Sequence, residues 1–93
     1  MNEITEALKN NCSYKEIKEL YEQWDDSSKE LLLADLAIVH RNYDAIRFIG
    51  DEAGTDIFYT PYDNNDRITP FYIAELLCTL NSEYKDICEF INR

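Results

Sequence analysis

The sequence predicts an all-α fold, and two observations lead to this fold class. Apolar residues recur at the spacing of one helix face in successive segments, and helix-capping residues precede several of these segments. No segment shows the strict alternation of a half-buried strand, although residues 56–59 allow a short extended piece. We therefore expect six helices in three hairpins, each closed by a turn of a few residues.

The first hairpin is predicted over residues 3–24. Its first helix, over about 3–10, carries Ile4, Ala7 and Leu8 on one face. Ser13 and Glu16 then have the spacing of a capping box, in which hydroxyl and carboxylate each accept a hydrogen bond from a free amide. The second helix has an apolar stripe at i, i+3, i+4 and i+7, formed by Ile17, Leu20, Tyr21 and Trp24.

The second hairpin begins with a second predicted capping box, formed by Ser27 and Glu30. The helix that follows, over about 28–41, is apolar nearly all round, so we expect it to lie at the centre of the fold. Asn42 is the expected cap of a helix over about 43–52. Gly54 fits the left-handed position that ends such a helix.

The third hairpin follows the one long irregular segment of the chain. Thr69 is the expected cap and Pro70 the first-turn residue of a helix that runs to about Leu80. A last helix carries Tyr84, Ile87, Cys88 and Ile91 at helical spacing. The link between the first two hairpins is short, at 25–28, whereas the next link is long, at 53–69. We expect a single domain over residues 1–93.

The third hairpin opens with the most specific motif of the chain, Thr69-Pro70-Phe71-Tyr72-Ile73-Ala74. It resembles the T-P-L-H-x-A motif of the ankyrin-repeat family, with Tyr72 in place of the histidine. Upstream, Leu36-Ala37 and the segments 42–49 and 53–56 are similar to the rest of one repeat, although the glycine between paired helices is missing from all three hairpins. The resemblance implies hairpins stacked as a short, divergent ankyrin-like solenoid that binds proteins without catalysis. The alternative fold is an irregular helical bundle.

A second resemblance concerns residues 54–61, GTDIFYTP, which are followed by DNND and the Thr69-Pro70 helix start. This segment looks like part of the colicin-type nuclease immunity proteins. In that family a short helix with two adjacent tyrosines and a proline docks on the toxin. Tyr59 matches one of these tyrosines, and Thr60 stands in the place of the other. The resemblance implies a toxin-binding surface at this segment.

The composition narrows the class of partner. The net charge is −10, from 19 acidic and 9 basic residues. This excess argues against nucleic acid or an anionic membrane as a direct ligand and favours a basic protein. Residues 51–66 contain acids and two tyrosines but no Lys or Arg, which predicts a partner-binding surface made of Asp51, Glu52, Asp56, Tyr59, Tyr62, Asp63 and Asp66. The alternative is a solvated loop whose tyrosines fold back onto the helices.

Catalysis has no support in the sequence. One histidine (His40), two glycines and the absence of a nucleophile motif provide no recognised catalytic, cofactor or metal site, so we expect a protein that is not an enzyme. The three cysteines lack metal-type spacing and are expected to be small buried thiols. The N-terminus lacks the pattern of a secretory signal, and the apolar cluster at 31–39 is too short to span a bilayer. We expect a cytoplasmic protein.

These observations favour one hypothesis on function. The chain is expected to be an immunity- or antitoxin-like inhibitor that covers the cationic groove of a basic, nuclease-type toxin. Two alternatives stay open, namely an ankyrin-like adaptor without an inhibitory role and an acidic mimic of DNA. The sequence does not specify the oligomeric state.

Overall fold

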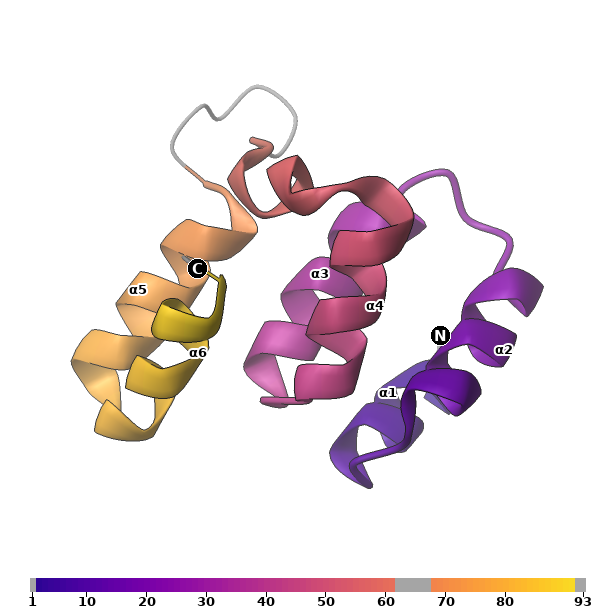
Figure 1. Cartoon of the computed structure of the whole chain (residues 1–93), viewed down its shortest axis with the longest axis horizontal. Helices are drawn as coiled ribbons and strands as arrows, with labels where there is room; N and C mark the ends of the chain where they lie inside the picture. Colours follow the sequence, from indigo (N-terminus) through magenta and orange to yellow (C-terminus); the bar gives the residue numbers. More distant parts are fainter. Residues whose placement is uncertain (1, 62–67, 92–93) are drawn as a thin grey trace.

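The computed structural model describes residues 2–61 and 68–91, and this part of the chain is helical and contains no strand (Figure 1). The described residues form six α-helices and two 3-10 helices, which confirms the predicted fold class and the three hairpins. The elements in chain order are α1 (Asn2–Lys9), α2 (Tyr14–Gln23), α3 (Lys29–Val39), α4 (Tyr43–Ala53), η1 (Thr55–Tyr59), α5 (Pro70–Leu80), η2 (Ser82–Tyr84) and α6 (Lys85–Ile91).

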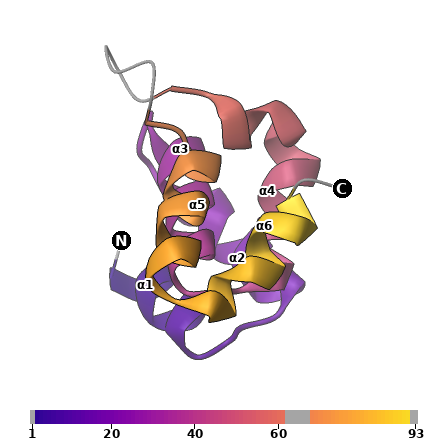
Figure 2. The same cartoon turned by 90° about the vertical axis from the view of Figure 1, so that its left-hand side faces the viewer.

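The three hairpins lie side by side, as Figures 1 and 2 show. The first helices of the hairpins are neighbours, since α3 packs against both α1 and α5, and α2 packs against α4. The turns within hairpins gather at one end of the molecule, and the links between hairpins lie at the other (Figure 1). The ankyrin-like stacking of these hairpins stays a prediction. In the described ranges, none of the helices has the length and apolar character needed to cross a bilayer.

Three of the predicted helix starts are confirmed. Ser13 and Glu16 form the capping box of α2, and Thr69 caps α5 with Pro70 in its first turn. Asn42 caps α4, because its Oδ1 accepts a hydrogen bond from the Ala45 amide at 3.0 Å.

The capping box predicted for Ser27 and Glu30 is wrong. The N-cap of α3 is Ser28, which makes no side-chain capping bond. Instead Asp26 Oδ1 accepts a hydrogen bond from the Ser28 amide at 2.8 Å. A carboxylate two residues before an amide competes directly with a serine hydroxyl for the same turn, and the charged acceptor forms the stronger bond.

The segment after α4 differs from its prediction as well. Gly54 ends α4 with the positive φ, +87°, that its predicted position requires, but its ψ of 152° lies outside the left-handed helical region, in a conformation that side chains also disfavour. The short extended piece allowed for residues 56–59 is wrong, because Thr55–Tyr59 is the 3-10 helix η1. Burial explains this outcome: the 3-10 turn places both Ile57 and Phe58 in the core.

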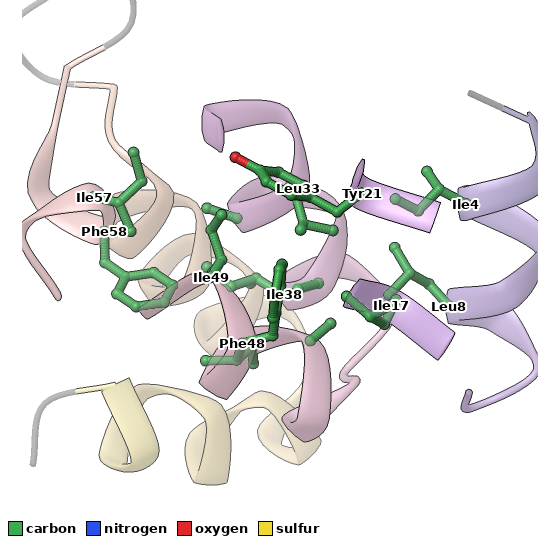
Figure 3. Packing of buried hydrophobic residues seen from close by; sticks show 14 of the residues in the cluster. Ile4, Leu8, Ile17, Tyr21, Leu33, Ile38, Phe48, Ile49, Ile57 and Phe58 are labelled. Carbon is green, nitrogen blue, oxygen red and sulfur yellow. The ribbon is translucent and has the colours of Figure 1, made fainter. Parts of the chain in front are cut away.

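One hydrophobic cluster joins all three hairpins. Figure 3 shows its members from the first two hairpins and η1. Helix α3 lies at its centre, as predicted, since it contacts α1, α4, α5 and η1. The largest buried side chains of the cluster include Leu8, Ile17, Leu33, Ile38, Ile49 and Ile87. Trp24, expected in the core, packs against the cluster but is only half-buried.

Candidate partner-binding surface

The 3-10 helix η1 is held to the body of the protein by two adjacent side chains. Ile57 and Phe58 are buried in the cluster, and η1 contacts α3, α4 and α5 (Figure 3). The Thr60 hydroxyl closes the helix by donating a hydrogen bond to the Asp56 carbonyl at 2.9 Å. Asp56 and Tyr59, the two predicted site residues of this element, are exposed. The buried anchor residues Ile57 and Phe58 therefore fix the turn of 3-10 helix from which Asp56 and Tyr59 are exposed.

Tyr59 has one part of its surface covered and the other open. Its ring packs on that of Phe71 at the start of α5, with centroids 5.2 Å apart and planes tilted by 43°. The residue nevertheless keeps 47% of its surface exposed. A ring supported in this way loses little conformational entropy when a partner covers its open side, which is a property of tyrosines at protein interfaces.

The structure separates Asp51 from this group. Asp51 Oδ2 accepts a hydrogen bond of 2.8 Å from the hydroxyl of Tyr14, a residue of the first hairpin. This bond is the main cause that raises the pKa of Tyr14. Arg47 lies over the Tyr14 ring at 5.4 Å and forms a salt bridge with Asp44 at 3.0 Å. Asp51 is therefore part of a network between α2 and α4.

Glu52 instead shares an electrostatic neighbour, Tyr21, with a residue that the sequence prediction missed, Glu30 at the start of α3. Both carboxylates act on Tyr21, whose pKa is raised by burial first and then by the negative charges of Glu30 and Glu52. Glu30 also lines a pocket of about 220 Å³ together with Ile57 and Thr60. The link between the first two hairpins and the link that contains η1 thus meet at the same end of the molecule.

We name this region the acidic end and define it as Asp26, Glu30, Glu52, Asp56 and Tyr59. The signal for Glu30 and Asp26 was present in the hairpin pattern. When hairpins follow one another along a chain, all the links between them lie at the same end of the molecule. Acids beside the 25–28 link are therefore expected at the same end as acids beside the 53–69 link. Tyr62, Asp63 and Asp66, also predicted as site residues, lie outside the described residues.

The cation nearest to these acids in the chain, Lys29, binds backbone carbonyls and a ring and forms no salt bridge with the described acids. Lys29 Nζ donates hydrogen bonds to the carbonyls of Tyr21, at 3.1 Å, and Trp24, at 3.2 Å, and lies 4.2 Å from the centroid of the Tyr21 ring. Two salt bridges join described residues, Arg41–Glu83 and Arg47–Asp44, and neither uses a carboxylate of the acidic end. The negative charge of the acidic end therefore has no ion pair within the described ranges.

The side chains of the acidic end can contribute hydrogen bonds and contact area to the binding of a partner. Within residues 2–61 and 68–91 there is no group of three histidine, cysteine or acidic side chains arranged to hold a metal ion. His40 lies at the C-terminal cap of α3, away from the acidic end. Exposed carboxylates accept hydrogen bonds from Arg and Lys of a partner, and a supported aromatic ring provides apolar contact area.

Comparisons with known proteins identify no relative of the chain. No protein-family model, no curated protein sequence and no solved structure matches it.

Proposed function

We propose that the protein is a non-catalytic inhibitor that binds a basic protein through the acidic end, as an immunity- or antitoxin-like protein does with a nuclease-type toxin. The observation that carries the proposal is that the exposed carboxylates of Glu30, Glu52 and Asp56, which form no salt bridge within the described residues, lie on the elements at the same end of the molecule as the supported ring of Tyr59. Cationic grooves that bind nucleic acid are complementary to such a surface.

The proposed mechanism is occlusion. The carboxylates attract the basic partner over a distance, and they then take the place of phosphates as acceptors for its Arg and Lys side chains. Tyr59 is the aromatic contact at the centre of the interface. Because the anchor residues Ile57 and Phe58 hold η1 in place before binding, little ordering free energy is spent in the complex.

The test is co-expression with the product of the neighbouring gene, followed by nuclease and growth-rescue assays. We expect wild-type protein to restore growth and the double variant Asp56→Ala/Tyr59→Ala to bind at least about tenfold more weakly, with unchanged helical circular dichroism. Affinity should also fall as salt is added.

A matched control lies at the opposite end of the molecule. Tyr43 is 36% exposed and its ring packs on Phe90 at 5.1 Å, much as Tyr59 packs on Phe71. Asp86 is an exposed acid in the first turn of α6. The variant Tyr43→Ala/Asp86→Ala should therefore keep full affinity and rescue. Equal loss in both variants, or no binding by wild type, contradicts the proposal.

A second candidate function, an adaptor that binds an apolar segment of another protein, is favoured by a different surface. Tyr72, Leu76 and Leu80 recur every four residues along α5 and are 37%, 45% and 84% exposed. Val39 at the end of the adjacent α3 is 39% exposed. Exposed apolar residues in one stripe are typical of protein-binding helix faces. If Leu76→Glu abolishes binding while Asp56→Ala/Tyr59→Ala does not, the adaptor function is supported and the inhibitor function is not.

A further inference from the structure

Two of the three cysteines lie together on the third hairpin. Cys78 is on α5 and Cys88 on α6, helices that pack against each other. Both line one pocket of about 390 Å³ together with Phe71, Glu75, Thr79 and Glu89, and Cys78 is one of the groups that raise the pKa of Cys88. Both residues are half-buried and free. Two sulfur atoms thus approach each other at a site that small molecules can enter.

Cys12 differs from this pair in its access to solvent and in its neighbours. It is buried, with 7% of its surface exposed, in the turn of the first hairpin. Its sulfur accepts a hydrogen bond from Asn42 Nδ2 at 3.7 Å. Cys12 is therefore an internal reference: it is also a free thiol, but it is shielded from dissolved oxidants and has no second thiol beside it.

From this geometry we propose that Cys78 and Cys88 form a dithiol site that is oxidised to an intramolecular disulfide by small disulfides such as glutathione disulfide. In the first step the thiolate of one cysteine attacks a sulfur of glutathione disulfide, so that one S–S bond forms, one breaks, and one glutathione thiolate leaves. The second cysteine then loses its proton and attacks the mixed disulfide. The Cys78–Cys88 bond forms and the second glutathione leaves, so that two protein thiols are oxidised and one glutathione disulfide is reduced to two thiols.

The geometry favours the second step over a persistent glutathione adduct. The resolving thiol lines the same pocket as the sulfur that it must attack, on a helix that packs against its own, and the S–S bond to be formed is about 2.05 Å long. The two residues lie on either side of one short helical turn, η2 (Ser82–Tyr84), which already holds the helices together. An intramolecular attack of this kind has a high effective concentration.

The surroundings of the pair also predict how the rate depends on pH. Burial raises the pKa of Cys88, and the neighbouring Cys78, Glu75 and Glu89 raise it further. Since the thiolate is the nucleophile, oxidation should be slow at neutral pH and faster as the pH rises. The exchange of Glu75 and Glu89 for glutamine should increase the rate at neutral pH.

The experiment uses the reduced full-length chain, incubated with glutathione disulfide at pH 8 and quenched with acid. We expect two of the three thiols to disappear, a monomer lighter by two hydrogen atoms, and no bound glutathione. Trypsin cleaves after Lys85, which lies between the two cysteines, so their peptides should stay joined until a reductant is added.

Variants of the three cysteines distinguish an internal Cys78–Cys88 disulfide from a glutathione adduct and from a disulfide between two chains. Cys12→Ser should form the same internal disulfide, whereas Cys78→Ser and Cys88→Ser should lose it and keep a glutathione adduct on the remaining thiol. Glutathione that accumulates on the wild-type protein, a disulfide that links two chains, or three intact thiols would each overturn the proposal.

Discussion

The two ends of the molecule are held together in different ways. We call the end where the turns within the hairpins lie the turn end, and it is opposite the acidic end. At the turn end, bonds between side chains and carbonyls tie each hairpin to the next. Asn42 donates to the Cys12 carbonyl at 3.3 Å, and the Tyr84 hydroxyl donates to the Val39 carbonyl at 2.7 Å. At the acidic end the negative charges of Glu30 and Glu52 both raise the pKa of Tyr21, and neither carboxylate forms a salt bridge within the described residues. We infer that the turn end stabilises the fold, whereas the acidic end can change without loss of the fold.

The largest effect is expected at Asn42, which is 1% exposed. Asn42→Ala removes the cap of α4 and leaves the Cys12 carbonyl without this donor. A lost cap costs about 0.5–2 kcal/mol and an unsatisfied buried acceptor about 1–3 kcal/mol, so unfolding by urea should show a loss of about 2–4 kcal/mol. Asn81→Ala is the matched control, because Asn81 caps η2 at an exposed position. A loss of equal size in both variants would contradict the role assigned to burial.

A smaller effect is expected at the bond between the second and third hairpins. Tyr84→Phe keeps the ring and removes only the hydroxyl that donates to Val39. The expected loss is about 1 kcal/mol in the free energy of unfolding. Glu83→Gln removes the exposed salt bridge with Arg41 nearby and should cost less than about 0.5 kcal/mol. If Glu83→Gln is the more damaging of the two, charge and not hydrogen bonding holds the turn end together.

Asp35, in the middle of α3, tests what burial does to a carboxylate away from the acidic end. One of its oxygens is buried without a hydrogen-bond partner among the described residues, and burial raises its pKa above the usual 3.8. The folded state therefore binds this proton more tightly than the unfolded state does. The resulting stability is complete below about pH 4 and is lost as the pH rises through the folded-state pKa.

Asp35→Asn removes this dependence on pH. We expect the variant to be more stable than wild type at pH 7, by up to about 1 kcal/mol, and no more stable at pH 3.5. Urea unfolding at several pH values measures the difference. A gain that is the same at all pH values would show that packing of the amide is responsible and not the charge.

Local caps and contacts between hairpins differ in how much the sequence could predict. Ser13, Asn42 and Thr69 act through local bonds to amides three residues away, so the sequence was sufficient to place them. The Asn42–Cys12 bond joins residues 30 apart, and the Tyr14–Asp51 bond joins residues 37 apart. No local pattern records such pairs, because they depend on how the hairpins pack.

The errors at the acidic end have the same origin. Asp26, Ser27 and Ser28 are all capable of capping α3, and local preferences do not decide among them. For residues 55–59 the decision between an extended and a 3-10 segment is made by the space that the core offers to Phe58. Glu30 was assigned to a helix and Asp56 to a loop, so their common position at one end became visible only in the folded chain.

The smallest expected effect on stability, and the most direct test of the acidic end, comes from Glu30→Gln/Glu52→Gln. Neither side chain is buried, so the free energy of unfolding should change by less than about 0.5 kcal/mol. The pKa of Tyr21 should nevertheless fall towards its usual value of 10, because two of the three causes that raise it are removed while burial remains. Nuclear magnetic resonance of tyrosine labelled at Cζ measures this pKa, with Tyr21→Phe to assign the signal. The control Glu75→Gln/Glu89→Gln removes the same charge from the third hairpin. It should leave Tyr21 unchanged, since an equal fall would mean that the net charge of the chain, and not the acidic end, sets the local potential.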